Sequence, residues 1–409
     1  MATFAAHRAD LQKDHSMTRS VIIASGVRTA IGTFSGSLAG KTPRALGAAV
    51  AQEAIRRAGL EGGDIQQTVL GNVMHSHPED MYISRVVAMD AGVPETSPAL
   101  TVNRLCGSGL QAVVTAAEQI MLGNADITLA GGAENMSRTG HLMPQVRHGQ
   151  KMGDLKAIDM MIGGLTDPFG NGHMGITAEN IAERNGIDRA TQDAFAVESH
   201  RRAAHAISEG RFRDQILPIE VRVGRNDVMF DTDEHVRANV TPADMQKLRP
   251  AFKPDGSVTA GNSSGINDGA AALVLMEQGV AQRQGVTPLA RIVGYGLGGV
   301  APEVMGLGPV PATRQALERA GLGIEDLDVV ESNEAFAAQA CAVSGDLGLS
   351  AEKVNPNGGA VALGHPIGAS GAIILVKLLY ELQRTGGRYG LATMCIGGGQ
   401  GIAVIVERI

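Results

Sequence analysis

An internal repeat is the feature that most restricts the fold of this chain. The string Arg-Ala-Gly-Leu occurs at 57–60 and again at 319–322, and in both places an aspartate and an apolar run follow it. Pro43 and Pro311 stand where a first helical residue is expected, and the glycine of each string suits a helix C-terminus. Each copy predicts a helix followed by a buried strand. Arg-Ala-Gly-Leu alone is a common helix ending, but the matching flanks indicate two duplicated halves.

The correspondence extends to the cysteines. In the first half, Cys-Gly-Ser-Gly at 106–109 precedes a helical run and then a strand. In the second half, a Gly-rich string at 364–371 precedes a helical run, and the following strand contains Cys395. Alternating strands and helices of this kind form α/β halves, whose ligands gather at loops beyond the strand ends. Duplication therefore predicts that Cys106, His365 and Cys395 approach one cleft.

The segment between the halves, roughly 136–265, has a different character. It is rich in Met, Gly, His and charged residues, and it carries helical patterns such as the one at 188–209, which Gly210 ends. We interpret it as an insertion that covers a site and not as a third copy of the repeat.

Composition excludes several classes of function. With 409 residues, 44% of them apolar and 19% charged, the chain is typical of a soluble enzyme of two or three domains. A net charge of −7 argues against general binding of nucleic acid. An anionic small ligand needs only a local basic patch. No apolar run is long enough to span a membrane.

The cysteines and the N-terminus predict a cytoplasmic protein. Cys106, Cys341 and Cys395 fit neither a disulfide framework nor a zinc pattern, which favours a reducing compartment. Residues 1–16 are polar and mixed in charge, without the apolar core of a secretory signal. His75 and His77 lie near Glu79 and Asp80, but no third well-spaced ligand follows, so we expect a solvated loop and no metal.

Four residues have the chemistry of a nucleophile, a base or a group that stabilises an oxyanion. A cysteine at a helix start, such as Cys106, should have a lowered pKa, and the glycines after it should let a substrate approach the backbone. His365, held between Gly and Pro before a helix, is suited to act as a base. The glycines after Cys395 offer N–H groups to an oxyanion. Asn333 either orients a water or carbonyl, or caps its own helix.

A dinucleotide site is the alternative reading of the Cys106 region. The run 107–112 matches the pattern G-x-G-x-x-A, and Glu134 stands about where a ribose-binding acid would. The preceding strand is short and interrupted, and the pattern should open the first βαβ unit, which disfavours this alternative.

The motifs together resemble the thiolase family. The strings that carry the resemblance, in the family's order, are Asn-Arg-Leu-Cys-Gly-Ser-Gly at 103–109, Gly-Gly-Ala-Glu-Asn-Met-Ser at 131–137, Asn-Glu-Ala-Phe at 333–336, Gly-His-Pro-Ile-Gly at 364–368 and Cys-Ile-Gly-Gly-Gly at 395–399. The likeness extends from about residue 19 to 409.

The resemblance implies a fold and a domain division. The fold is α/β, with a five-layered α/β/α/β/α core of two duplicated halves plus an inserted loop domain. The N-terminal half would comprise 19–135 and 266–287, the loop domain 136–265, and the C-terminal half 288–409.

It also implies catalytic roles. Cys106 would be acylated with His365 activating it, and Cys395 would be the second acid and base. One oxyanion site would comprise His365 and a water held by Asn333. The other would use the N–H groups of Cys106 and Gly397, since two thioester carbonyls must be polarised in turn.

The substrates implied are acetyl-CoA and a 3-ketoacyl-CoA, with no further cofactor. The positions that match the CoA channel and acyl pocket are Leu165, His173, Met174, Arg237, Leu248, Phe252, Ala260, Ser264, Met305, Ala335 and Phe336. Arg237, near Lys247 and Arg249, would hold a phosphate unless it is a solvated surface charge. Gly172 stands where the short-chain type often has a larger aromatic, which could leave room for a longer acyl chain.

The expected function is reversible condensation of acetyl-CoA with an acyl-CoA, or the reverse thiolysis, in fatty acid metabolism. The segment near 137–160 resembles the loop that joins dimers into a homotetramer. Two alternatives remain: a decarboxylating condensing enzyme, and a non-catalytic acyl-CoA binding protein with a thiolase-like fold.

Overall fold

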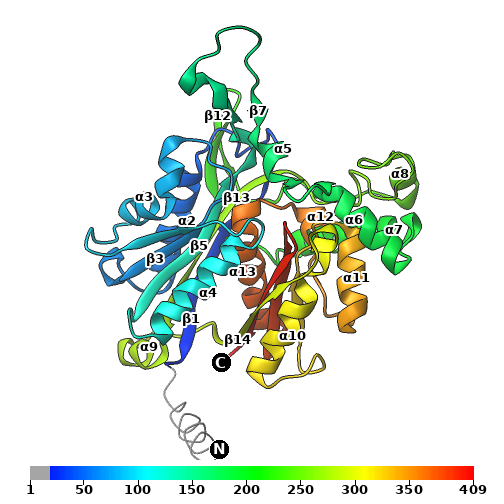
Figure 1. Cartoon of the computed structure of the whole chain (residues 1–409). Helices are drawn as coiled ribbons and strands as arrows, with labels where there is room; N and C mark the ends of the chain where they lie inside the picture. The colour runs from blue at the N-terminus through cyan, green and yellow to red at the C-terminus, as the bar shows by residue number, and fades with distance from the viewer. Residues whose placement is uncertain (1–18) are drawn as a thin grey trace, which may run out of the picture.

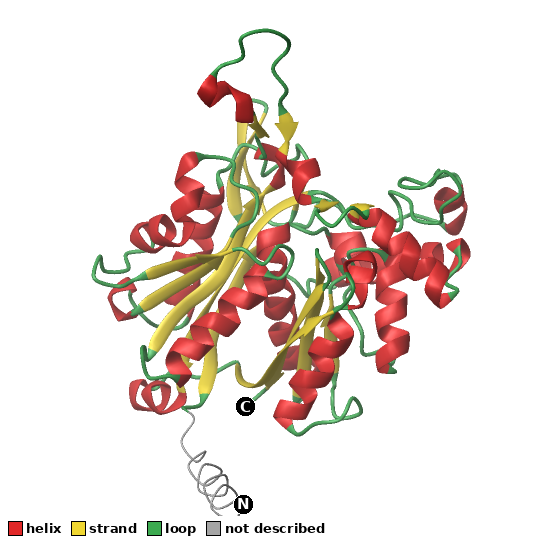
Figure 2. Cartoon of the chain, in the orientation of Figure 1, coloured by secondary structure: helices red, strands yellow, loops and turns green. Residues whose placement is uncertain are grey.

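The computed structural model describes residues 19–409, and the sequence repeat appears in it as two sets of strands with the same topology. The expectations for residues 1–18 lie outside the described residues. Figure 2 shows the two sets of strands with helices between and around them.

The first set has the order β1-β13-β5-β3-β4, in which β1 and β13 are antiparallel, β13 and β5 are antiparallel, and β5, β3 and β4 are parallel. The bounds are β1 Val21–Thr29, β3 Gln67–Gly71, β4 Ala99–Val102, β5 Ile127–Asn135 and β13 Asn267–Glu277, with β2 Gly32–Thr33 and β10 Ile216–Leu217 paired at the side. Its helices are α2 Pro43–Arg57, α3 Ile83–Asp90, α4 Ser108–Met121 and α9 Gln278–Gln284.

The second set repeats this pattern. Its order is β14-β17-β16-β15, again antiparallel, antiparallel and then parallel. The bounds are β14 Ala290–Gly299, β15 Val329–Ser332, β16 Tyr389–Ile396, β17 Gln400–Glu407, α10 Pro309–Ala320, α11 Ala337–Leu347, α12 Ala360–Leu363 and α13 Ile367–Thr385. The predicted duplication is thus confirmed by topology. The two sets meet where β1 pairs with β14 at Ile22 and Ile23.

The helices that follow the Arg-Ala-Gly-Leu pattern differ at their starts. Thr42 caps α2 by accepting from the N–H of Ala45, and Pro43 is the first helical residue, as predicted. The second helix begins at Pro309, so the prediction that Pro311 begins it was wrong. Pro311 lies within the first turn, where an N–H has no partner inside the helix and a proline is tolerated.

Five layers result from the packing. Helices α4 and α13 pack against each other between the two sets of strands, α2 and α3 cover the outer face of the first set, and α10 covers that of the second. Figure 1 shows α4 and α13 side by side at the centre. The predicted five-layered fold is therefore confirmed.

Glycines permit the close crossing of α4 and α13. A Cβ at Gly109 would lie 2.8 Å from the N atom of Ala372, and one at Gly371 would lie 2.3 Å from the N atom of Leu110. A Cβ at Gly107 would lie 2.5 Å from Ile396 Cδ1. The glycines after Cys106 thus serve helix and strand packing, and the expectation that they admit substrate to the backbone stays a prediction.

The segment between the halves contacts both of them: β10 pairs with β1 of the first half, and the helices pack on the second. Helices α6 and α7 pack on α11, and α7 also packs on α12. Its elements are β6 His141–Leu142, β7 Ile158–Asp159, α5 Met160–Gly164, β8 Thr166–Asp167, β9 Gly172–His173, α6 Met174–Asn185, α7 Arg189–Ser208, β11 Ile219–Val223, β12 Asn226–Phe230 and α8 Pro242–Gln246. Short 3-10 helices span Gly62–Asp64, Pro78–Tyr82, Met136–Arg138, Pro144–His148 and Pro302–Leu307.

The exact domain limits stay a prediction. Within residues 19–409, no helix is both long enough and apolar enough for a membrane span.

Candidate active site

A small cavity brings together most of the residues predicted for the site. Its volume is about 60 Å³. The loop before α4, the inserted segment and the C-terminal half all contribute to its lining, which comprises Leu105, Cys106, Gly164, Leu165, His173, Met174, Ser264, Met305, Ala335, Phe336, His365, Ile367 and Gly397. A cysteine and a histidine thus lie in the same cavity, as the duplication predicts.

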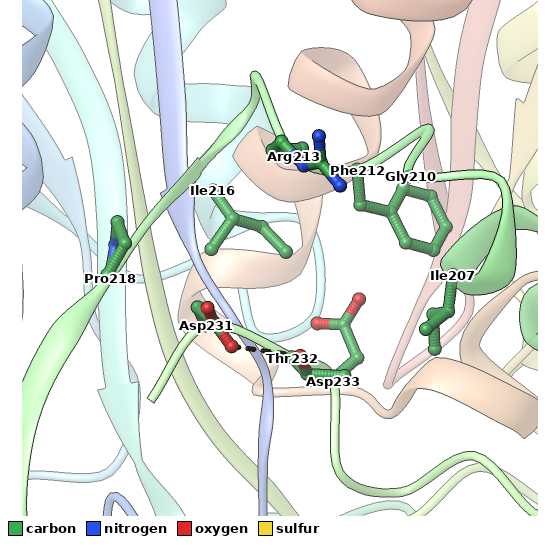
Figure 3. A pocket seen from close by; sticks show the side chains of 9 residues that line it. All are labelled: Ile207, Gly210, Phe212, Arg213, Ile216, Pro218, Asp231, Thr232 and Asp233. Atoms are coloured by element: carbon green, nitrogen blue, oxygen red, sulfur yellow. Dashed lines mark hydrogen bonds between the residues drawn. The ribbon is translucent and has the colours of Figure 1, made fainter. Parts of the chain in front are cut away.

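A larger hollow elsewhere lacks such chemistry. Figure 3 shows this hollow, of about 220 Å³, lined by Phe212, Arg213 and Asp233 among others. The Asp233 carboxylate accepts from Arg28 at 2.7 and 2.9 Å, and both side chains are fully buried. Its lining contains no cysteine or histidine. The smaller cavity is therefore the candidate active site.

Cys106 lies on the turn between β4 and α4. Its neighbour Leu105 has φ +46°, a left-handed conformation that is uncommon for a leucine and costs energy. The turn is held by the Gly107 N–H, which donates to the Arg104 carbonyl at 3.1 Å, and by the Arg104 N–H, which donates to Ser108 Oγ at 2.9 Å. A strained backbone maintained in this way presents the half-buried Cys106 side chain to the cavity.

The pKa of Cys106 was predicted to be low, and that prediction was wrong. Burial raises the pKa of this thiol to about 11, although hydrogen bonds from the N–H groups of Gly397 and of Cys106 itself oppose the rise. The negative charge of Glu134 raises the pKa further. The loss of hydration raises the pKa more than the positive end of helix α4 lowers it, because α4 begins only at Ser108. Cys106 is therefore a thiol at neutral pH and needs a base.

His365 has the properties of that base. Burial lowers its pKa to about 4, so the ring is neutral at pH 7. Nδ1 lies 2.6 Å from Ser370 Oγ, and the Ser370 hydroxyl donates to the Pro366 carbonyl at 2.9 Å. Because that hydroxyl proton is already committed to Pro366, Nδ1–H must donate to Ser370, which leaves a lone pair on Nε2.

The free nitrogen of His365 is buried in the site. Nε2 has no hydrogen-bond partner among residues 19–409, and His365 lines the cavity with Cys106. The backbone of the histidine is also fixed, because its N–H donates to Asn267 Oδ1 at 2.9 Å. The arrangement can accept a proton from Cys106.

Cys395 is buried next to the cavity and does not line it. It lies at the end of β16 opposite Gly401 and packs in an apolar cluster with Met174, Met305 and Phe336, all of which line the cavity. Burial raises the pKa of this thiol, and the charge that Cys106 carries when ionised raises it further. Cys395 packs against side chains that line the cavity together with Cys106, and the predicted approach of the two cysteines agrees with this position.

Asn333 follows β15 and does not cap a helix. Helix α11 begins at Ala337, after Phe336, so the capping alternative was wrong. Both polar atoms of the Asn333 side chain are buried without a hydrogen-bond partner in the described part of the chain. Asn333 lies outside the cavity, whereas Ala335, two residues on, lines it.

The residues predicted to bind CoA divide into two groups. Leu165, His173, Met174, Ser264, Met305, Ala335 and Phe336 line the cavity. Phe252 lies just behind them: its ring stacks on His173 with centroids 4.7 Å apart and meets Phe336 edge to face at 6.0 Å.

Arg237, Leu248 and Ala260 lie away from the cavity. Arg237 and Ala260 are exposed, and Leu248 packs near Met245 and Val361. The Arg237 N–H donates to His200 Nδ1 at 3.1 Å. The alternative that Arg237 is a solvated surface charge agrees with this position.

The sequences of the two halves match family models along nearly all of the described chain. The N-terminal domain of thiolase matches residues 21–279, and the C-terminal domain of thiolase matches residues 286–408. The chain belongs to the thiolase family. The predicted family and the enzyme class, an acyltransferase, are thereby confirmed.

Several thiolases are similar to this chain over their whole length. The chain is 60% identical to beta-ketothiolase BktB of Cupriavidus necator, covering 96% of this chain and 100% of the relative. It is 52% identical to the acetyl-CoA acetyltransferase of Syntrophomonas wolfei, again over 96% and 100%. The crystal structure of human mitochondrial 3-ketoacyl-CoA thiolase superposes with a TM-score of 0.95 at 42% identity, covering 96% of this chain and all of that one.

The dinucleotide alternative is wrong for this member of the thiolase family. Glu134 is fully buried, and its carboxylate accepts from the N–H groups of Val73, Met74 and Gly368 at 2.9–3.1 Å. It therefore joins the two halves beneath the site and is not available to a ribose. Burial raises its pKa to about 8.

The sequence analysis did not identify the roles of two residues of this site, Ser370 and Glu134. Ser370 was not singled out, although its place in the first turn of the helix after His365 was a usable signal. The role of Glu134 depends on contacts between segments distant in sequence, and nothing local indicates it.

The loop that contains His75 and His77 lies outside the site. His77 accepts from the Glu79 N–H and caps the 3-10 helix Pro78–Tyr82, as expected of a solvated loop.

Proposed function

We propose that this enzyme catalyses the thiolase reaction, in which free CoA and a 3-ketoacyl-CoA are converted reversibly to acetyl-CoA and a shortened acyl-CoA. The observation that carries the proposal is one cavity that holds the Cys106 thiol and the buried lone pair of His365, with a second thiol, Cys395, next to it. The CoA thioesters are substrates, and no further cofactor is proposed.

In thiolysis, His365 Nε2 takes the proton of Cys106, and the sulfur attacks the 3-keto carbon. The bond between carbons 2 and 3 then breaks, and its electron pair becomes the acetyl-CoA enolate, which Cys395 protonates. The acyl group remains on Cys106 until the sulfur of free CoA, whose thiol proton restores Cys395, attacks its carbonyl carbon. The Cys106 sulfur then leaves and recovers its proton from His365. Condensation is the same sequence reversed, with Cys395 removing the α-proton.

The two oxyanions of this sequence need separate donors. The Gly397 N–H and the Cys106 N–H both form hydrogen bonds that lower the pKa of the Cys106 thiol. Their position supports the proposal that they stabilise the oxyanion that forms next to the Cys106 sulfur. His365 and a water held by Asn333 are proposed for the second. A decarboxylating condensing enzyme is less well supported, because it would leave Cys395 without a role. A non-catalytic binding protein is also less well supported, because it would have no use for the hydrogen bond between His365 and Ser370 that leaves a lone pair on Nε2.

The acyl range is proposed to be short to medium. Met305 lines the cavity, and its unbranched side chain can adapt to different acyl ends. Gly172 does not support a wider pocket, because it lies outside the cavity lining and its φ of +78° favours glycine. The crystal structure of human mitochondrial 3-ketoacyl-CoA thiolase in complex with CoA superposes on this chain with a TM-score of 0.93.

A homotetramer in the cytoplasm is proposed as the working form, with a role in fatty acid metabolism. The segment that leads into β7 projects from the body of the molecule (Figure 1), and it exposes Leu142, Val146, Met152 and Leu155. Apolar side chains gathered on a projecting segment are typical of contacts between subunits.

The thiolysis assay tests the proposed function. Addition of free CoA to acetoacetyl-CoA or 3-ketohexanoyl-CoA should remove the enolate absorbance of each at turnover rates of about 1–1000 per second, the usual range of enzymes. We expect both to be substrates, and the ratio of their kcat/KM values gives the chain-length preference. If the folded enzyme turns over neither, the short-chain proposal fails.

Ser370→Ala should lower kcat about fivefold to tenfold and leave KM nearly unchanged. The lost hydrogen bond contributes roughly 0.5–1.5 kcal/mol, and without it the ring is free to place its proton on Nε2. Nitrogen NMR of labelled histidine should show the change of tautomer, which a merely structural defect would not produce. Ser370→Thr, which keeps the hydroxyl, is the control. An unchanged tautomer with unchanged kcat would contradict the assignment.

A further inference from the structure

A second, smaller chamber borders the loop that carries His365. Its volume is about 10 Å³, close to the space that one water molecule requires. Asn333, Gly364 and Ser370 line it together with Glu331 and Lys377. Since His365 itself lines the active-site cavity, the loop 364–370 contacts both spaces.

One wall of the chamber carries a buried ion pair. Lys377 Nζ lies 2.7 Å from Glu331 Oε2 and donates to the Gly358 carbonyl at 2.8 Å. The two side chains are only 3% and 1% exposed. Removing two charges from water is costly, and a buried pair of this kind needs further hydrogen bonds to compensate. An ammonium has three donors, so Lys377 retains one beyond these two contacts.

Several polar atoms of residues that line the chamber have no protein partner. They are Glu331 Oε1, Ser332 Oγ, Asn333 Oδ1 and Asn333 Nδ2, all buried and unpaired within residues 19–409. Glu331 and Asn333 are two residues apart at the end of β15, a spacing that places side chains on one face of a strand. Several unpaired groups around one water-sized space are unusual in a folded protein, where buried polar groups are almost always satisfied.

We propose that this chamber is a water-binding site, and that the Glu331–Lys377 pair uses its water to orient the amide of Asn333. One water can donate to Glu331 Oε1 and to Asn333 Oδ1 while accepting from Lys377. An Asn333 amide held through its oxygen directs its NH₂ group away from the pair. Glu331 and Lys377 are then positioning residues for the second oxyanion site. The inference rests on the proposed function, in which Asn333 serves the enolate.

The chamber should affect one half of the reaction only. Acylation of Cys106 depends on His365 as its base and on the N–H groups of Cys106 and Gly397. Formation of the acetyl-CoA enolate depends on Cys395 as its base and also requires the water held by Asn333. Exchange of the acetyl hydrogens of acetyl-CoA in D₂O measures the enolate step. The burst of acyl-enzyme, followed by intact-protein mass spectrometry, measures the acylation step.

Glu331→Gln and the double variant Glu331→Gln/Lys377→Met test the proposal in the full-length enzyme. We expect hydrogen exchange to fall about tenfold to a hundredfold, less than the loss of an oxyanion donor outright, which costs about 10²–10³. The acylation burst and KM should stay within about twofold of the wild type. Glu407→Gln is the matched control and should change neither step, because Glu407 is a buried carboxylate that pairs with Arg388 at the far end of β17 and does not line the chamber.

Equal loss of both steps, or no loss in a folded variant, would overturn the proposal. If the variants do not fold, a high-resolution crystal structure of the wild type decides. It should show one water within hydrogen-bond distance of Glu331 Oε1 and the Asn333 amide, and a dry chamber would refute the site. A wild-type enzyme that neither acylates nor exchanges would instead count against the proposed function, whatever the chamber contains.

Discussion

Cys106→Ala should lower the rate of thiolysis by about 10⁶, the scale of loss seen when a nucleophile is removed from a catalytic unit. The other groups of the site cannot compensate, because without a sulfur at this position no acyl-enzyme forms. The neutral His365 ring has a pKa of about 4 and is a poor base toward water. Steady-state thiolysis measures the loss. Mass spectrometry after incubation with acetyl-CoA should show an acetyl adduct on the wild type and none on the variant.

Cys341→Ala is the matched control. Cys341 is also a partly buried cysteine whose pKa burial raises to about 11, but it lies on α11 outside the cavity. Its replacement should change kcat less than about twofold, as expected of a substitution away from the chemistry. An acetyl adduct that persists in Cys106→Ala, or turnover within tenfold of the wild type, would show that the nucleophile is another residue.

The architecture could be predicted because it repeats. Each half carries its own capped helix, its glycine at the helix end and its buried strand, so local signals occur twice and confirm one another. The placement of Cys106 and His365 in one cavity followed from this symmetry. The start of the second helix was misplaced because Pro309 and Pro311 are both acceptable in a first turn.

The electrostatics of the site could not be predicted from local sequence. A cysteine near a helix start suggests a low pKa, but burial against Met74, Ile367 and other distant residues determines the actual direction. The same holds for the glycines after Cys106, whose constraint comes from α13 and β16. Both effects depend on tertiary packing between the halves.

The contacts of the inserted segment were also predicted unevenly. His173 and Met174 lie at the start of a regular helix, α6, and both reached the cavity as expected. Arg237 and Ala260 lie on irregular loops, where neither a period of 2 nor one of 3.6 determines which way a side chain points. Whether Arg237 binds a phosphate stays a prediction.

Cys395→Ala should lower both thiolysis and condensation by about 10²–10⁴, the usual contribution of a positioned acid or base. Burial raises the pKa of this thiol, so it is protonated in the resting enzyme and ready to deliver a proton to the enolate. Its proximity to Cys106 explains how one small site can serve both a carbonyl carbon and the carbon next to it. Acylation of Cys106 by acetyl-CoA does not require this proton and should stay within a few-fold of the wild type.

Hydrogen exchange and packing separate this role from a structural one. Exchange of the acetyl hydrogens of acetyl-CoA in D₂O should fall with turnover in Cys395→Ala. Cys395→Ser nearly restores the volume, but its hydroxyl is a far weaker acid than a thiol, so it should restore the melting temperature and not the exchange. If serine restored both, the cysteine would be needed only for packing in the apolar cluster with Met174 and Phe336. Full exchange in the alanine variant would assign the proton to another group.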